Sequence, residues 1–184
     1  MIIKRVSGQK EILGIKELQN SNLKRNLDAD EIQRDGFVTA EYSIPLLEYM
    51  NRIEPSVVAM DNEIVAGYAL VVTKELIGQH DLLDDLFNEI NRQTYNGDLL
   101  KDIDYAIVGQ LCVAKMYRGS GLVAAMYKFY KEQLSPKYKY LVTDVEDKNP
   151  RSIKAHVKTG FQIIGTSNYG GGNWHIVLWD WNKE

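Results

Sequence analysis

The residues best suited to chemistry lie in one run, Leu111 to Val123, where a β-rich segment passes through glycines into a helical segment. The first N–H groups of a helix have no acceptor within it, and the helix dipole adds partial positive charge there. Gly119 and Gly121 let the backbone approach a bound anion closely, and Arg118 adds a cation with a fork of donors. The run predicts a cradle for a pyrophosphate group, or else only a tight strand-to-helix turn.

Two other motifs are excluded in this run. A nucleotide P-loop needs Gly-Lys-Ser/Thr after its turn, and no such tripeptide follows here. A nucleophile elbow needs Gly-x-Ser-x-Gly, which the run does not contain. Cys112 is the single cysteine and has no identifiable base partner, so we interpret it as a small core residue. One cysteine also excludes a disulfide or a cysteine-based metal site within the chain.

The run resembles the coenzyme A-binding motif of the GNAT superfamily of N-acetyltransferases, Arg/Gln-x-x-Gly-x-Gly/Ala. Its three defining positions hold Arg118, Gly121 and Val123, and Val123 departs from the usual Gly or Ala. A second run, Asn149 to Phe161, is similar to the family's Asn-x-x-Ser/Ala…Gly-Phe segment, with one expected strand between the two runs. Two motifs in the family's order are more specific than either motif alone.

The resemblance implies an α/β fold with a mixed, mostly antiparallel central sheet, flanking helices and a splayed cleft for acetyl-coenzyme A as the acetyl donor. It implies that the pantetheine arm pairs with the strand residues Leu111, Cys112 and Val113. It also implies that the pyrophosphate is held by Arg118, Gly119, Ser120, Gly121, Leu122 and Val123. From the other side, the arm would be lined by Asn149 and Ser152.

In this family the amine attacks the thioester directly, without a covalent enzyme intermediate. The resemblance implies that the backbone N–H near Val113 stabilises the oxyanion. His156 stands where the family often has Tyr, and an imidazole can donate a proton near neutral pH. We therefore predict that His156 is the catalytic acid; the alternative is that it only packs beside the coenzyme.

The general base is less well defined. Some members carry Glu on the strand before Leu111, where this chain has Gln110, which cannot act as a base. The candidates for taking the proton of the amine are Asp104, Tyr105, Asp144 and Glu146. The acidic strand end that contains the last two could attract a cationic amine, or it could simply be solvated.

Strands and helices are expected to alternate around these runs, which predicts an α/β layered domain. Residue patterns predict strands over 1–6, 56–60, 64–73, 105–113, 138–145, 161–166 and 174–181. They predict helices over 9–26, 44–53, 82–90, 119–134 and 149–159. In the last helix, Asn149 is the expected N-cap, Pro150 the first residue and Gly160 the terminator. Residues 28–42 are mixed, and Gly36 breaks them.

Length and composition fit one domain over 1–184, with the coenzyme A-binding core at about 105–166. The 22 Lys+Arg against 25 Asp+Glu give a net charge of −3, which argues against nucleic-acid binding because that needs a basic face. The longest apolar stretch is too short to span a bilayer, so no membrane association is expected. A start without a signal-peptide layout favours the cytoplasm. His80 and His175 lack metal-ligand spacing, so no metal is expected.

These observations favour an acetyl-coenzyme A-dependent N-acetyltransferase that acts on a primary amine of a small molecule or peptide. The alternative is a non-catalytic acyl-coenzyme A sensor or interaction module with the same fold. An unrelated phosphate-binding α/β domain is a third class, and the ordered pair of motifs argues against it. Dimers are common in the family, which makes a homodimer one expectation.

Overall fold

The computed structural model describes residues 1–183 and divides into two compact units. Unit 1 comprises Met1–Val72 and Gly109–Tyr130, and unit 2 comprises Thr73–Val108 and the chain from Lys131 onward. Each unit thus joins segments that are distant in the sequence. The single domain expected over 1–184 stays a prediction.

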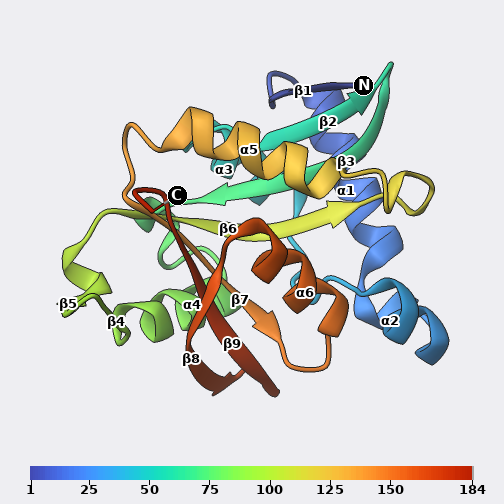
Figure 1. The fold of residues 1–184 in the computed structure, drawn as a ribbon. Coiled ribbons are helices and arrows are strands. Elements are labelled where there is room, and N and C mark those ends of the chain that lie inside the picture. The colour runs from blue at the N-terminus through green and yellow to red at the C-terminus, as the bar shows by residue number, and fades with distance from the viewer. Residues whose placement is uncertain (184) are drawn as a thin grey trace. The chain divides into compact units, whose positions relative to one another are not determined.

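One sheet contains seven strands: β1 (Ile2–Arg5), β2 (Val57–Asp61), β3 (Ile64–Val72), β6 (Tyr105–Val113), β7 (Tyr140–Glu146), β8 (Gln162–Tyr169) and β9 (Gly172–Asp180). Their order is β1-β2-β3-β6-β7-β9-β8, and β6 is the strand that the two units share (Figure 1). The β6–β7 pair is parallel, whereas the β1–β2, β2–β3, β7–β9 and β8–β9 pairs are antiparallel. These pair directions confirm the expected mixed, mostly antiparallel sheet.

The helices of unit 1 are α1 (Gln9–Asn22), α2 (Ala29–Asp35), α3 (Ile44–Ile53) and the first part of α5 (Leu122–Leu134). Unit 2 contains α4 (Asp81–Asn91) and α6 (Pro150–Thr159). Shorter elements are the 3-10 helices η1 (Lys24–Asn26), η2 (Lys74–Leu76), η3 (Leu100–Asp102) and η4 (Lys115–Tyr117), and the hairpin of β4 (Thr94–Tyr95) and β5 (Asp98–Leu99). Among residues 1–183, no helix has the length and apolar character needed to cross a membrane.

A β-bulge decides which helix each part of β3 faces. Ala66 is an extra residue on β3, because the pairing with β2 skips it between Val65 and Gly67. Val65 consequently lies against Gly14 of α1, whereas Gly67 lies against Met126 of α5. The two helices therefore cover opposite sides of β3 within unit 1 (Figure 1).

Two helices differ from their expected bounds for backbone reasons. α5 begins at Leu122 rather than at Gly119, because Gly119 and Gly121 adopt φ values of 78° and 83°, which lie outside the right-handed helical region. α1 ends at Asn22, earlier than expected, because Leu23 is extended, with φ −62° and ψ 133°.

α2 forms where the sequence predicts only a mixed segment. Asp28 accepts a hydrogen bond from the N–H of Glu31 at 2.8 Å, and the Glu31 side chain reaches back to the N–H of Asp28. This reciprocal capping box satisfies two N–H groups at the helix start. Gly36, with φ 73°, ends the helix at the expected break.

Candidate functional site

The end of β6 is anchored to β3 before the chain turns toward α5. The N–H of Ala114 donates to the carbonyl of the bulged Ala66 at 2.9 Å. The N–H of Tyr117 closes η4 on the carbonyl of Ala114 at 2.8 Å, and the Tyr117 hydroxyl donates to Asp61 at 2.8 Å. The turn that follows therefore starts from a fixed point of the unit 1 sheet.

The turn before α5 exposes open backbone. Both Gly119 and Gly121 have left-handed φ values, and beyond their chain neighbours nothing lies within 4 Å of where a Cβ would stand on either. The hydroxyl of Ser120 donates to the carbonyl of Tyr117 at 2.6 Å, which fixes the turn. Because the N–H groups that open a helix lack acceptors within it, the start of α5 at Leu122 can bind an anion such as a diphosphate.

The guanidinium of Arg118 braces this turn. Its Nε donates to the carbonyl of Val113 at 3.1 Å, and its Nη2 donates to Oδ1 of Asn22 at 2.5 Å. Its Nη1 lies 3.5 Å from Oδ1 of Asp35. These contacts join the turn to β6, α1 and α2, so the backbone N–H groups are left as the main donors to an anion.

The strand residues expected to meet pantetheine lie at the end of β6. Leu111 is half-buried, and Cys112 and Val113 are buried. Burial raises the pKa of the Cys112 thiol to about 12, so this thiol keeps its proton at neutral pH. A protonated thiol is a poor nucleophile, which supports the interpretation of Cys112 as a core residue.

Gln110 belongs to a buried polar network that the sequence does not predict. Its Oε1 accepts from Nε2 of Gln19 at 3.0 Å and from the hydroxyl of Tyr68 at 2.6 Å. Its Nε2 donates to the carbonyl of Ala40 at 2.8 Å. The only signal in the sequence is a single amide side chain in an otherwise apolar strand, and nothing in its spacing identifies these partners.

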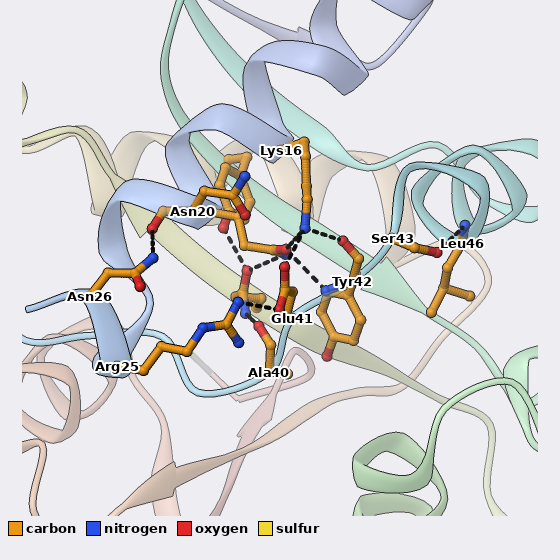
Figure 2. A network of polar contacts seen from close by, with 12 residues as sticks. Lys16, Asn20, Arg25, Asn26, Ala40, Glu41, Tyr42, Ser43 and Leu46 are labelled. Carbon is orange, nitrogen blue, oxygen red and sulfur yellow. Dashed lines mark hydrogen bonds and ion pairs between the residues drawn. The ribbon is translucent and has the colours of Figure 1, made fainter.

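The network holds the connection between α2 and α3 in place. Tyr42 donates its N–H to Oε1 of Gln19 at 3.0 Å and its hydroxyl to the carbonyl of Gly109 at 3.1 Å. Figure 2 shows Lys16 beside this segment, where its Nζ lies 3.0 Å from both the carbonyl of Tyr42 and Oε1 of Glu41. We name as the Gln110 clamp the residues Gln19, Ala40, Tyr42, Tyr68 and Gln110.

In unit 2 the backbone ladder between β6 and β7 is short. It pairs Tyr105–Ile107 with Tyr140–Val142. The next carbonyl along β6, that of Val108, accepts from the hydroxyl of Thr143 at 2.7 Å. β7 itself continues to Glu146 in antiparallel pairing with β9. A side chain therefore replaces the backbone donor where the β6–β7 ladder ends.

The second sequence motif forms α6 as expected. The side chain of Asn149 accepts from the N–H of Ser152 at 3.2 Å, Pro150 is the first helical residue, and Gly160 ends the helix with φ 120°. Asn149 is buried and Ser152 is half-buried. The predicted cap is confirmed, and the contact of Asn149 and Ser152 with pantetheine stays a prediction.

His156 is buried on α6, and its Nδ1 lies 2.8 Å from the carbonyl of Ser152. A carbonyl only accepts, so Nδ1 carries the proton. The ring packs edge-on to Phe161 at 5.0 Å between centroids. Burial lowers the pKa of His156 to about 4, which leaves the imidazole neutral at pH 7. These contacts count against the acid role, which stays a prediction.

Three of the four candidate bases differ in their surroundings. Tyr105 is buried, donates its hydroxyl to Asn91 at 2.8 Å, and has its pKa raised by burial, so it holds its proton at neutral pH. Asp104 is exposed just before β6, and Glu146 is buried at the end of β7 opposite Trp174.

Among residues 1–183, no three His, Cys, Asp or Glu side chains are grouped to hold a metal ion.

The fourth candidate, Asp144, is half-buried on β7 and accepts a hydrogen bond from the hydroxyl of Tyr169 on its Oδ2. Burial raises the pKa of Asp144 to about 6; the Tyr169 hydrogen bond lowers it, and the charge of Glu146 raises it. A carboxyl group with this pKa is ionised at neutral pH and still accepts a proton readily.

His156 and Asp144 face opposite sides of the unit 2 sheet. Phe161 connects His156 to Trp179, with ring centroids 5.0 Å and 5.7 Å apart. Trp179 pairs with Leu141 on β7, and side chains alternate along a strand, so Leu141 and Asp144 point to opposite faces. The two side chains therefore cannot exchange a proton directly.

The sequence model of the acetyltransferase (GNAT) family matches residues 25–161. This match includes both runs that carry the resemblance and spans most of the chain. The chain therefore belongs to the GNAT acetyltransferase family, as the two motifs predict, and this membership agrees with acetyl-coenzyme A as the acetyl donor. Comparison with curated proteins finds no match.

Solved structures share this fold over nearly the whole chain. A GNAT family acetyltransferase from Streptococcus agalactiae is 17% identical, with a TM-score of 0.65 over 97% of this chain and 95% of that one. The ribosomal-protein-S18-alanine N-acetyltransferase from Escherichia coli is 13% identical, with a TM-score of 0.62 over 97% and 92%. A chain of the NatC complex bound to Gag peptide and coenzyme A is 14% identical, with a TM-score of 0.66 over 97% of both chains. At these identities the likeness shows the fold alone.

Proposed function

We propose that the protein is an acetyl-coenzyme A-dependent N-acetyltransferase that transfers the acetyl group to a primary amine by direct attack on the thioester. Family membership supplies the reaction class. The turn at Gly119 and Gly121 carries the assignment of the coenzyme, because its open left-handed backbone leads into the start of a helix. A diphosphate is the anionic group of coenzyme A that such a turn suits.

In this proposal the backbone of residues 118–123 holds the pyrophosphate, and the pantetheine arm follows Leu111–Val113. Asn149 and Ser152 line the arm, and the N–H of Val113 donates to the oxyanion. Within unit 2, the carbonyl of Val108 accepts from the hydroxyl of Thr143 rather than from a backbone N–H of β7, which supports an interruption of the ladder near this point.

The acceptor in this proposal is the primary amine of a small molecule or a peptide. Two structures of the same fold favour testing peptides first: one holds a Gag peptide, and the other is named for acetylating an alanine of a ribosomal protein. We therefore propose a free peptide N-terminus as the first acceptor to test. A cytoplasmic location and a homodimer remain predictions.

The test is a thiol-release assay with acetyl-coenzyme A and a panel of polyamines, amino acids and short peptides with free N-termini. We expect one class of amine to raise thiol release, with an acetylated product that is 42 Da heavier by mass spectrometry, about the mass that replacing N–H by N-acetyl adds in any covalent acetylation. Peptides with an acetylated N-terminus are the matched controls. Binding of acetyl-coenzyme A without thiol release from any amine would support the sensor alternative instead.

A further inference from the structure

Asp144 occupies a distinctive position on β7. It follows Val142, the last residue of β7 in the β6–β7 ladder of unit 2. It also follows Thr143, whose hydroxyl donates a hydrogen bond to the carbonyl of Val108. On its other side β7 remains fully paired with β9, where Ile176 stands opposite Asp144. The carboxylate is therefore held on a strand that pairs with β9 along its whole length.

The hairpin of β8 and β9 holds Tyr169 against this carboxylate. The ring of Tyr169 stacks on Trp174, with centroids 5.3 Å apart and planes 18° from parallel. The indole Nε1 of Trp174 donates to the carbonyl of Tyr169 at 3.0 Å. With its ring and its backbone both fixed, Tyr169 donates its hydroxyl to Oδ2 of Asp144, which leaves Oδ1 as the oxygen without this donor.

Asp144 has neighbours on β7, on β8 and on β9. Glu146 shares its face of β7, two residues further along the strand. Ile176 faces it from β9, and Tyr169 from β8. α4, which packs on β7, buries Leu83, Leu86, Phe87 and Ile90, and its carboxylates Asp84, Asp85 and Glu89 are half-buried. Tyr169 and Glu146 act on the pKa of Asp144 in opposite directions: the hydrogen bond from Tyr169 lowers it and the charge of Glu146 raises it.

We propose that Asp144 is the general base of the acetyl transfer and that Tyr169 is the positioning residue that orients its carboxylate. This inference rests on the proposed function. Two observations support it: the position just beyond the last β6–β7 backbone pair of unit 2, and a fixed hydrogen-bond donor on one oxygen only. A pKa of about 6 matches a base that works near neutral pH.

The proton balance of the step is simple. The ammonium group of the acceptor gives one proton to Oδ1 of Asp144 and becomes a neutral amine. Its nitrogen lone pair forms the N–C bond with the thioester carbonyl, and the C–S bond then breaks with its electron pair on sulfur. The second amine proton neutralises the departing thiolate, and Asp144 returns its proton to water. The products are the N-acetyl amine, coenzyme A and one proton.

The test compares the pH dependence of kcat/KM in the wild type and three variants. Asp144→Asn should lower turnover by about 10²–10⁴-fold, the usual contribution of a general base, with unchanged stabilisation by acetyl-coenzyme A. Tyr169→Phe removes a hydrogen bond that lowers the pKa of Asp144, so the acid limb should move to higher pH. Glu146→Gln removes a charge that raises this pKa, so the acid limb should move to lower pH.

Asp147→Asn is the matched control, because Asp147 is an exposed carboxylate just past the same strand and should leave the limb in place. Melting temperatures confirm that each variant is folded. Full turnover by Asp144→Asn would overturn the inference. So would pH profiles of Tyr169→Phe and Glu146→Gln in which kcat/KM falls at the same acidic pH. A wild-type protein that releases thiol with no amine in the panel would instead defeat the proposed function, so the two failures are distinguishable.

Discussion

At the scale of single residues, His156 links burial to pH. Its pKa is lowered from 6.5 to about 4 by burial, so the unfolded chain takes up a proton at a higher pH than the folded chain. The stability that His156 contributes is therefore complete above about pH 6.5 and falls as the pH drops toward 4. The whole loss amounts to about 3 kcal/mol, since one pKa unit corresponds to about 1.4 kcal/mol.

Denaturant unfolding of the wild type and His156→Asn between pH 7 and pH 4 measures this effect. Asparagine keeps a donor for the carbonyl of Ser152 but cannot titrate. Asp144, whose raised pKa has the opposite pH dependence, is present in both proteins and cancels in the difference. We expect the wild type to lose more stability than the variant toward pH 4. Parallel curves would show that the imidazole is not buried as described.

The same variant tests the catalytic role predicted for His156. With its pKa lowered to about 4 and its Nδ1 proton donated to the carbonyl of Ser152, the imidazole of His156 has little of the charged form at pH 7 that an acid would use. We therefore expect His156→Asn to keep kcat within about threefold, a loss well below the 10²–10⁴-fold typical of a general acid. A loss in that larger range with unchanged affinity for acetyl-coenzyme A would establish the acid role instead.

Gly121 offers a second test at the residue scale, with Gly78 as a matched control. Their φ values are 83° and 84°, and nothing lies within 4 Å of an added Cβ on either. Leucine at either position should cost about 1–2 kcal/mol of stability, because a left-handed conformation is strained for any side chain. Only Gly121→Leu should weaken coenzyme binding, by about tenfold or more, since one lost hydrogen bond to a charged group is worth about 1.5–3 kcal/mol. Calorimetric titration with acetyl-coenzyme A measures the difference, and equal affinities would remove the cradle assignment.

At the scale of elements, the Gln110 clamp connects β6 to α1 and to the segment before α3. Gln110→Leu leaves the buried donors of Gln19 and Tyr68 and the carbonyl of Ala40 without this partner. We expect a loss of about 2–4 kcal/mol, because each unsatisfied buried polar group costs about 1–3 kcal/mol and the site relaxes in part. The control is Gln162→Leu on β8, an exposed position that should stay within about 0.5 kcal/mol. Equal unfolding midpoints in urea for the two variants would contradict the clamp.

Some helices and strands have the bounds that local sequence patterns predict, and others do not. α3 and β6 have the expected bounds, and α6 has the expected cap and terminator. α2 was not expected, because its capping box at Asp28 lies in a short segment without apolar periodicity. α5 begins later than expected because Gly119 and Gly121 have left-handed φ values. The spacing of apolar side chains, from which the helix is predicted, carries no information on these φ values.

At the scale of the whole molecule, coenzyme binding should stabilise the folded chain. A ligand that binds only the folded state at 100 times its Kd adds about 2.7 kcal/mol of stability. We therefore expect the melting temperature to rise with the concentration of acetyl-coenzyme A and of free coenzyme A, and not with ATP. Differential scanning fluorimetry measures this. An equal shift with ATP would show a general phosphate site rather than a coenzyme A site.

The sequence by itself determined the family and the local geometry that carries it. The order of the two motifs predicts the GNAT family, and the strand that ends at Val113 and the helix after Asn149 follow from periodicity and caps. These signals lie within a few residues of one another, so they can be read before any fold is known.

Only the tertiary structure decided how the polar side chains are used. Gln19 and Gln110 are 91 positions apart in the sequence, and Asp144 and Tyr169 are 25 positions apart. No local spacing of residues therefore predicts either contact. Burial is also set by the assembled fold: it lowers the pKa of His156 and raises that of Asp144. Proton affinity depends on the dielectric and the partners that distant segments bring, and those exist only once the chain has folded.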